Sequence, residues 1–191
     1  MLQREVHTRG IVIARRAAGE GSVRVLLYTE ELGLVRAQLT SGREERSQLR
    51  PYLLPGTVGI YSLVRGKAEW RVTGAYQCQI TMYAAHMSAA RESAQRVLEL
   101  VRRFVHGEER NDALFSALFG FLNELPVLSG EDIEPAEHLA AVRLLAALGY
   151  VEEVGLGTML SDSYQKSLAP AREHRTELIA RIHRGFEASG I

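Results

Sequence analysis

The stretch SVRVLLYTEELGLVRAQLT, residues 22–40, contains two successive runs in which side chains on alternate positions are apolar. On an extended chain this alternation places Val23 and Leu27 on one face and Arg24 on the other. The Glu-Leu-Gly sequence at 31–33 separates the runs and has the composition of a tight turn. The stretch therefore predicts two strands joined by a short turn, each with one face toward a core.

The same pattern covers most of the first 80 residues, where β-branched and aromatic residues occupy many of the apolar positions. Five such runs are present, at residues 10–16, 22–29, 32–40, 57–66 and 68–77. Most connections are short turns, whereas 41–56 is much longer and follows the third run. Because closure into a barrel removes exposed strand edges, we predict a five-stranded OB-fold barrel with a helix or extended excursion in that long connection.

The apolar period changes to 3.6 after residue 85, which indicates helices. Asn111 is a good N-cap for the second of them, and Pro135 is expected in the first turn of the third. The second helix is apolar on nearly every face, which predicts a central position in an all-helical core. The expected helices cover residues 90–106, 111–125, 134–149 and 171–190.

Together these patterns predict an α+β protein of two domains. Residues 1–80 are expected to form the N-terminal OB-fold β-barrel, and residues 81–191 an all-α helical bundle. The chain shows no internal repeat and no low-complexity segment.

The composition is ordinary for a globular chain, with 46% hydrophobic and 24% charged residues. No apolar run approaches the roughly 20 residues needed to cross a bilayer, and the N-terminal MLQREVHTRG lacks the apolar region of a signal peptide. The single cysteine, Cys78, excludes an internal disulfide and a cysteine-based zinc site. We therefore expect a cytoplasmic protein with no membrane segment, no metal and no cofactor.

The net charge of zero conceals opposite charges in the two halves. Residues 1–80 contain 12 Arg and Lys against 7 Glu, a balance of +5, whereas residues 81–191 contain 11 against 16 acidic residues, a balance of −5. This asymmetry favours an anion-binding N-terminal module. Only Lys67 and Lys166 are lysines, and selection for bidentate phosphate contacts and genomic base composition both remain explanations for the preference for arginine.

No pattern in the chain indicates catalysis. A P-loop, a dinucleotide fingerprint and a nucleophile elbow are all missing, and Cys78 is most simply a small apolar filler. The histidines are scattered, with no pair at i, i+4: His7, His86, His106, His138, His174 and His183. We therefore expect a protein that is not an enzyme and has no catalytic residues.

Arginines on the outward faces of the predicted strands are candidates for contacts with DNA phosphates. The connection TSGREERSQLRPY, residues 40–52, adds further arginines, although Glu44 and Glu45 offset part of their charge. The candidate DNA-binding residues are Arg24, Arg36, Arg43, Arg46, Arg50, Lys67 and Arg71. For each of them the alternative is a solvated surface cation, and both interpretations stay open.

Aromatic residues in the same half have two possible roles. Small barrels bind single strands by combining a positive groove with aromatic stacking surfaces, but aromatic side chains also pack barrel cores. The residues to which both roles apply are Tyr28, Tyr52, Tyr61, Trp70 and Tyr76.

Two stretches resemble the RecO family of bacterial recombination mediators. Residues 10–57 have its serial order of strand, Gly-Glu turn, strand, turn, strand and basic Gly-Arg loop, and RLLAALGYVEEVG at 143–155 is similar to its Leu-Gly-Tyr segment. The matching residues in the first stretch are Gly10, Ile11, Val12, Gly19, Glu20, Ser22, Tyr28, Thr29, Gly33, Gly42, Arg43, Leu53 and Pro55.

The resemblance implies an OB-fold domain followed by a helical domain, and a DNA repair function. Members of the family bind single- and double-stranded DNA and anneal complementary strands. With the partner RecR they assist loading of the RecA recombinase onto single strands covered by single-strand-binding protein. The resemblance also implies a cytoplasmic, nucleoid-associated location.

Two departures from the family pattern qualify this expectation. Many members have zinc-binding cysteines after the Leu-Gly-Tyr segment, but VEEVGLGTMLSDS at 151–163 contains none, so we expect no zinc. The chain is also shorter than is usual in the family, and the missing length is expected around 155–172.

The alternative function is a non-enzymatic adaptor that works through the helical half and binds little DNA itself. The apolar helix at 111–125 is compatible with a partner groove, and RecR or the acidic C-terminal tail of single-strand-binding protein would be the partner. A groove for an acidic tail needs cations, and the candidates are Arg102, Arg103 and Arg143, each of which is also a plausible solvated helix arginine.

Overall fold

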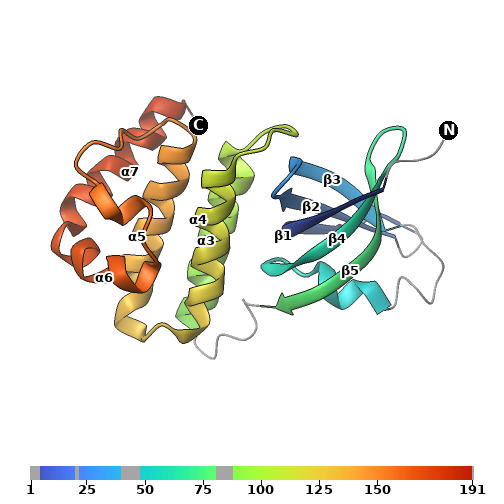
Figure 1. Ribbon diagram of the computed structural model, residues 1–191, viewed down its shortest axis with the longest axis horizontal. Coiled ribbons are helices and arrows are strands. Elements are labelled where there is room, and N and C mark those ends of the chain that lie inside the picture. The colour runs from blue at the N-terminus through green and yellow to red at the C-terminus, as the bar shows by residue number, and fades with distance from the viewer. Residues whose placement is uncertain (1–4, 20–21, 40–47, 81–87, 191) are drawn as a thin grey trace. The chain divides into compact units, whose positions relative to one another are not determined.

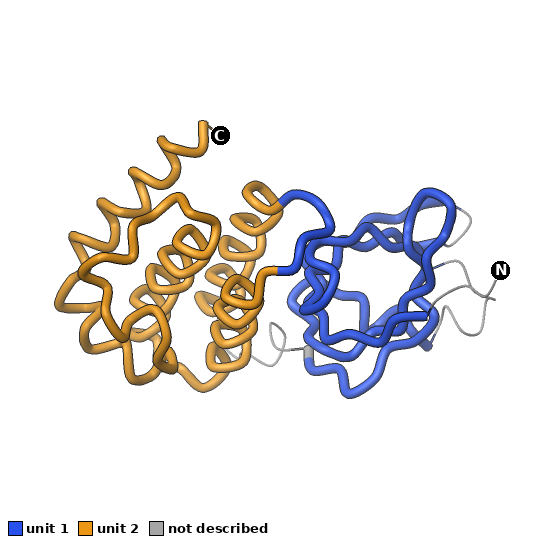
Figure 2. The backbone as a smooth tube through the Cα atoms, turned by 45° about the horizontal axis from the view of Figure 1, so that its top comes forward, with its two compact units in different colours: residues 1–81, 106–110 blue, residues 82–105, 111–191 orange. Residues whose placement is uncertain are grey.

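The computed structural model describes residues 5–19, 22–39, 48–80 and 88–190. The chain forms two compact units (Figure 2). The first, the barrel unit, contains residues 1–81 together with the short segment 106–110. The second, the helical unit, contains residues 82–105 and 111–191.

Five strands form the barrel unit (Figure 1). They are β1 Glu5–Ala17, β2 Val23–Thr29, β3 Gly33–Leu39, β4 Thr57–Arg65 and β5 Trp70–Ile80. They close in the order β1-β2-β3-β5-β4, with β4 paired to β1 and all pairs antiparallel except β3 with β5. This arrangement confirms the predicted OB-type barrel followed by helices.

The barrel core is made by the inward faces that the alternation predicts. Val23, Val25 and Leu27 of β2 are buried, as are the equivalent apolar residues of β3. The long connection ends in η1, the short 3₁₀ helix Arg50–Leu53, whose Leu53 is fully buried in this core. A helical turn in this connection agrees with the expectation for an OB-type barrel.

Over residues 88–190 the structure describes five α-helices in the helical unit: α3 Ser88–Phe104, α4 Asp112–Glu124, α5 Gly130–Ala147, α6 Tyr164–Glu173 and α7 Arg175–Ser189. Two short 3₁₀ helices, η2 Leu125–Val127 and η3 Gly157–Leu160, follow α4 and precede α6. The helix at the centre is α5, because it packs against α3, α4, α6 and α7. The expectation of a central helix at 111–125 is therefore wrong. Its apolar side chains supply one wall of the core, whereas the alanines of α5 let four helices approach closely.

Helix ends follow local capping chemistry. Asn111 caps α4 as predicted, since its side-chain oxygen accepts from the Leu114 N–H at 2.9 Å. The helix expected at 134–149 begins earlier, at Gly130, where Ser129 donates its hydroxyl to the Asp132 carboxylate and the first turn contains Glu131 and Asp132. The expected final helix is in fact two helices, with α6 ending and α7 beginning around His174.

Candidate nucleic-acid interface

A line of polar side chains crosses four strands on the outer face of the barrel. In the strand register Arg16 of β1 is opposite Arg24 of β2, and Arg24 is opposite Gln38 of β3. Gln38 is in turn opposite Arg71 of β5. Neighbouring strands are about 4.8 Å apart, so this line, hereafter the arginine row, extends over about 14 Å.

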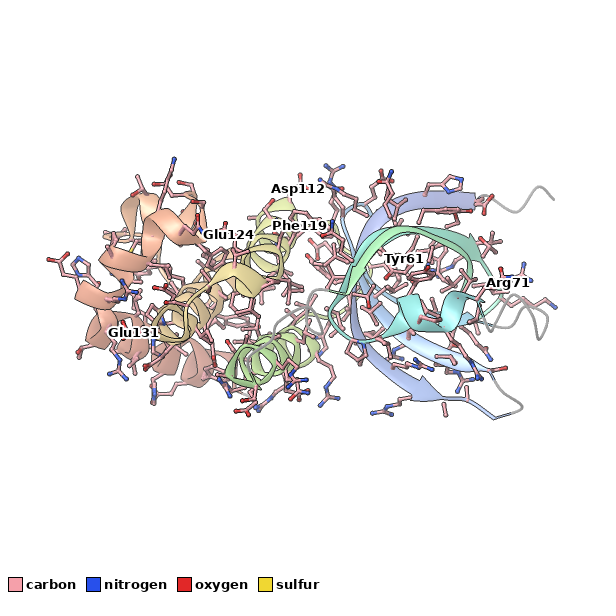
Figure 3. The ribbon with its side chains drawn as sticks, turned by 90° about the horizontal axis from the view of Figure 1, so that it is seen from below. Tyr61, Arg71, Asp112, Phe119, Glu124 and Glu131 are labelled. Carbon is pink, nitrogen blue, oxygen red and sulfur yellow. The ribbon has the colours of Figure 1, made fainter. Side chains whose placement is uncertain are left out.

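The strand alternation places these side chains outside. Arg24 and Arg71 are exposed and lie between buried residues on their strands, and Figure 3 shows Arg71 directed away from the barrel. Arg36 lies two residues from Gln38 on the same face of β3 and is also exposed. The outward orientation predicted for Arg24, Arg36 and Arg71 is thus what the fold shows.

Arg16 joins the row because of a β-bulge in β1. The register shifts between Val12 and Ala14, so that Val12 is opposite the inward Leu27 whereas Ala14 is opposite the outward Leu26. A bulge of one residue reverses the faces of all residues that follow it. Without it, Arg16 would share the inward face of Val12. Sequence alternation alone could not assign Arg16 to the row.

The β4–β5 turn borders the same outer face. Its Glu69 carboxylate lies 3.2 Å from Nε of Arg24, which brings the turn against β2. Lys67 is exposed on this turn. In OB folds this turn and the face of strands 2 and 3 commonly bind oligonucleotides. Glu69 offsets part of the positive charge of Arg24, so the net positive charge at the row is smaller than its three arginines alone would give.

The three arginines predicted in the long connection have different outcomes. Arg43 and Arg46 lie outside the described residues. Arg50 is in η1, half-buried at the end of the barrel, and its carbonyl oxygen accepts from Nη1 of Arg15 at 3.3 Å. The structure therefore does not place Arg50 in the arginine row, and its contact with DNA stays a prediction.

Most of the aromatic candidates belong to the core. Tyr28 and Tyr61 are fully buried and Trp70 is 7% exposed, which leaves Tyr52 and Tyr76 exposed. Tyr61 points into the barrel (Figure 3), its hydroxyl donates to the carbonyl of Tyr52 at 2.9 Å, and burial raises its pKa. Stacking on a base is therefore possible only at the two exposed tyrosines.

Residues 106–110 complete the barrel unit from a distant part of the sequence. Glu108 accepts two hydrogen bonds from Nη1 of Arg65, at 2.6 and 2.7 Å, and one from the indole N–H of Trp70 at 3.1 Å. The Gly107 carbonyl accepts from the N–H of Leu34 at 3.2 Å. No local pattern in the sequence indicates this contact, because its partners are more than 30 residues away.

Gly33 is the residue that lets this segment approach the barrel. Its φ is +70°, and a Cβ at this position would lie 2.2 Å from the Glu109 carbonyl oxygen. A larger residue would therefore force the segment and β3 apart.

The three arginines proposed for partner binding in the helical unit differ in accessibility. Arg102 is exposed and forms a bidentate ion pair with Glu99, and Arg103 is exposed. Arg143 is buried, and its Nε and Nη2 donate to backbone carbonyls and a hydroxyl within the unit. It lines a cleft of about 410 Å³ between α4, α5 and the segment 160–164.

Metal ligands and the single thiol are the other groups of chemical interest in the described residues. Residues 5–19, 22–39, 48–80 and 88–190 contain no group of three or more His, Cys, Asp or Glu that could hold a metal. Burial raises the pKa of the Cys78 thiol, which disfavours the nucleophilic thiolate. Within the same ranges no helix is long and apolar enough to cross a bilayer.

Comparison with family models identifies both parts of the chain. The model described as Recombination protein O N terminal matches residues 1–75, which hold all five strands up to the middle of β5. The model described as Recombination protein O C terminal matches residues 93–151. The chain belongs to the RecO family. The resemblance seen in the strand order and in the Leu-Gly-Tyr segment is thereby confirmed.

Curated RecO relatives are similar over most of this chain. A DNA repair protein RecO of Dehalococcoides mccartyi is 29% identical over 147 residues, 77% of this chain and 57% of the relative. The DNA repair protein RecO of a second strain of this organism is 30% identical over 162 residues, which are 85% of this chain and 62% of the relative. The Haemophilus influenzae protein of the same name is 32% identical over 142 residues, which are 74% of this chain and 58% of the relative. The matched region thus spans about three fifths of these RecO proteins.

Proposed function

We propose that this RecO protein is a non-catalytic DNA repair and recombination mediator that binds DNA phosphates on the outer face of its barrel. The arginine row carries the proposal, because it presents three cations and an amide in a line across four strands. Contacts of this type hold the nucleic acid backbone with little sequence preference. Arg36 and Lys67 extend the same face.

Family membership supports the finer parts of the proposal. These parts are annealing of complementary strands, docking on RecR and on the tail of single-strand-binding protein, and assistance to RecA loading in the cytoplasm near the nucleoid. Annealing of oligonucleotides covered by single-strand-binding protein tests them together. An unchanged annealing rate on adding this protein, with DNA binding intact, would contradict the mediator role.

Replacing Arg16, Arg24 and Arg71 by alanine tests the interface. Each exposed contact contributes under about 1 kcal/mol, so we expect affinity for a labelled oligonucleotide to fall about thirtyfold. The slope of log affinity against log salt should fall by about 2 for a single strand, since fewer counterions are released. Fluorescence anisotropy over a range of salt concentrations measures both quantities.

The matched control removes the same charge from the helical unit, with Arg91, Arg175 and Arg184 replaced by alanine. These residues are exposed on α3 and α7, so this variant should retain affinity and salt slope if the row is the binding site. Equal losses in the two triple variants would show that net charge, and not the row, determines binding.

Replacing Glu69 by glutamine should have the opposite effect. The change removes the carboxylate 3.2 Å from Arg24 and frees that guanidinium for a phosphate. The pair is exposed, with side-chain accessibilities of 59% and 30%, so its effect is small and we expect affinity to rise about threefold. Anisotropy with the same oligonucleotide measures it. Unchanged affinity would place the β4–β5 turn away from DNA, and weaker binding would show that Glu69 itself supports the interface.

The adaptor alternative is not favoured by the position of its candidate residues. Arg143 is already hydrogen-bonded within the helical unit, and Arg102 is paired with Glu99. If the intact chain bound a peptide of the acidic tail of single-strand-binding protein but did not bind DNA, the adaptor function would be favoured over the mediator function.

A further inference from the structure

Tyr76 is an exposed aromatic residue whose ring folds back over Gly74 of β5. Its side chain is 55% exposed, which is unusual beside the other aromatic residues of the barrel. A Cβ built on Gly74 would lie 2.6 Å from the Tyr76 hydroxyl oxygen and 2.8 Å from Cε2. The ring therefore folds back along the strand and occupies the space that a side chain at position 74 would need. The hydroxyl end of the ring thus lies over Gly74, and the residue keeps more than half of its surface open.

The register places this ring on the outer face of the barrel. Gly74 is opposite Ser62 and Tyr76 is opposite Ile60 on β4. Ser62 is in turn opposite His7 on β1, whose Nδ1 lies 2.7 Å from the serine hydroxyl. The ring is thus bordered by a polar, exposed imidazole and not by an apolar core. The ring therefore packs over Gly74 beside Ile60, and more than half of the residue stays exposed.

The backbone next to the ring has an unusual conformation. Gln77 has φ +48°, the only positive φ outside glycine among the described residues. For a residue other than glycine this conformation costs free energy, and such positions are frequent at binding sites. The β4–β5 register shifts at this point, between Val58 and Ile60, so Gln77 lies in a β-bulge that directly follows Tyr76.

The ring lies on the same strand as the end of the arginine row. Arg71 is opposite Val64 and Gly74 is opposite Ser62, because the β4–β5 register shifts between them. Gly74 therefore lies on the same outer face as Arg71, about 7 Å along the strand. A flexible strand whose phosphates contact the row can therefore bring an unpaired base over the ring. A duplex keeps its bases paired and stacked on one another, so its bases do not reach such a surface.

We propose that Tyr76 stacks on an unpaired base and gives the barrel a preference for single-stranded over double-stranded DNA. This inference rests on the proposed function, because it takes the arginine row as the site of the phosphates. Stacking is sequence-tolerant, since every base has a π-face, which is consistent with a mediator that has little sequence preference.

The test compares Tyr76→Ala with Tyr76→Phe on single- and double-stranded oligonucleotides of one sequence. One base stack accounts for about tenfold in affinity, so Tyr76→Ala should weaken single-strand binding about tenfold and leave duplex binding unchanged. Tyr76→Phe keeps the ring and should bind as the native chain does. The salt slope should not change in either variant, because stacking releases no counterion.

A fluorescent base gives a second, direct measurement. Stacking on tyrosine should quench 2-aminopurine placed in the single strand, and Tyr76→Ala should abolish that quenching while Tyr76→Phe retains it. Unchanged single-strand affinity in Tyr76→Ala, or an equal loss on single strands and duplex, would overturn the inference. So would a tenfold loss in Tyr76→Phe.

The outcome is separable from that of the proposed function. If the row triple variant binds DNA like the native chain, the proposed site fails whatever Tyr76 does. If the row variant fails to bind while Tyr76→Ala binds normally, the site stands and the stacking inference fails. Thermal unfolding monitored by Trp70 fluorescence verifies that each variant retains the barrel, since this residue is the only tryptophan and is buried in it.

Discussion

Replacing Arg143 by methionine should lower the free energy of unfolding of the helical unit by about 3–5 kcal/mol. The guanidinium donates to the carbonyls of Met159 and Asp162 at 2.7 Å and to the hydroxyl of Ser167 at 3.0 Å. It also lies over the ring of Tyr164, 4.2 Å from the centroid. Methionine fills part of the volume but leaves three acceptors without this donor, two of them in buried hydrogen bonds, and each buried group costs about 1–3 kcal/mol.

Arg103→Met is the matched control for this prediction. It makes the same chemical change on an exposed position of α3, where substitutions usually change stability by less than about 0.5 kcal/mol. Denaturant unfolding followed by far-ultraviolet circular dichroism reports the helices, whereas Trp70 fluorescence reports the barrel separately. A loss below 1 kcal/mol for Arg143→Met, or an equal loss in both variants, would show that the segment after α5 is not held by this side chain.

Replacing Glu108 by alanine should destabilise the barrel unit by about 2–3 kcal/mol. The ion pair with Arg65 is half-exposed, with side-chain accessibilities of 52% and 41%, and contributes under about 1 kcal/mol by itself. Most of the loss comes from the indole N–H of Trp70, which is buried and would lose its acceptor. Arg65 also lies 5.0 Å from the Trp70 ring centroid, a contact that the carboxylate helps to hold.

Glu109→Ala provides the comparison, because it removes the same charge from the neighbouring position, which is exposed. Its effect should be below about 0.5 kcal/mol. Trp70 fluorescence measures both variants, and Glu108→Ala should in addition shift the emission of the folded state, since it changes the group bonded to the indole. Identical unfolding curves for the two variants would mean that the 106–110 segment contributes nothing to the barrel.

Much of the fold follows from local pattern. Period-two alternation determines which side of β2 and β3 faces the core, and hence the outward position of Arg24 and Arg36. The long connection between the third and fourth strands predicts the helical turn η1. These features depend only on residues that are close together in the chain, so they can be predicted from one sequence.

The parts that sequence did not show depend on register and on distant contacts. Arg16 reaches the row only because β1 has a bulge, and no residue type in GIVIARR marks its position. The Glu108 contact joins residues 43 and 38 positions apart. The central place of α5 depends on alanines that admit neighbouring helices, whereas apolar content alone favoured α4.

The segment 106–110 also limits how this RecO chain can be divided. The polypeptide passes from one unit to the other after residue 81, returns after 105 and leaves again after 110. The barrel is therefore not a contiguous module. A transplant of residues 1–80 into another protein would omit the acceptor for Trp70 and the carbonyl bonded to Leu34. A chimera that combines the barrel of one RecO chain with the helical unit of another would fold only if the α3–α4 connection comes from the same chain as the barrel.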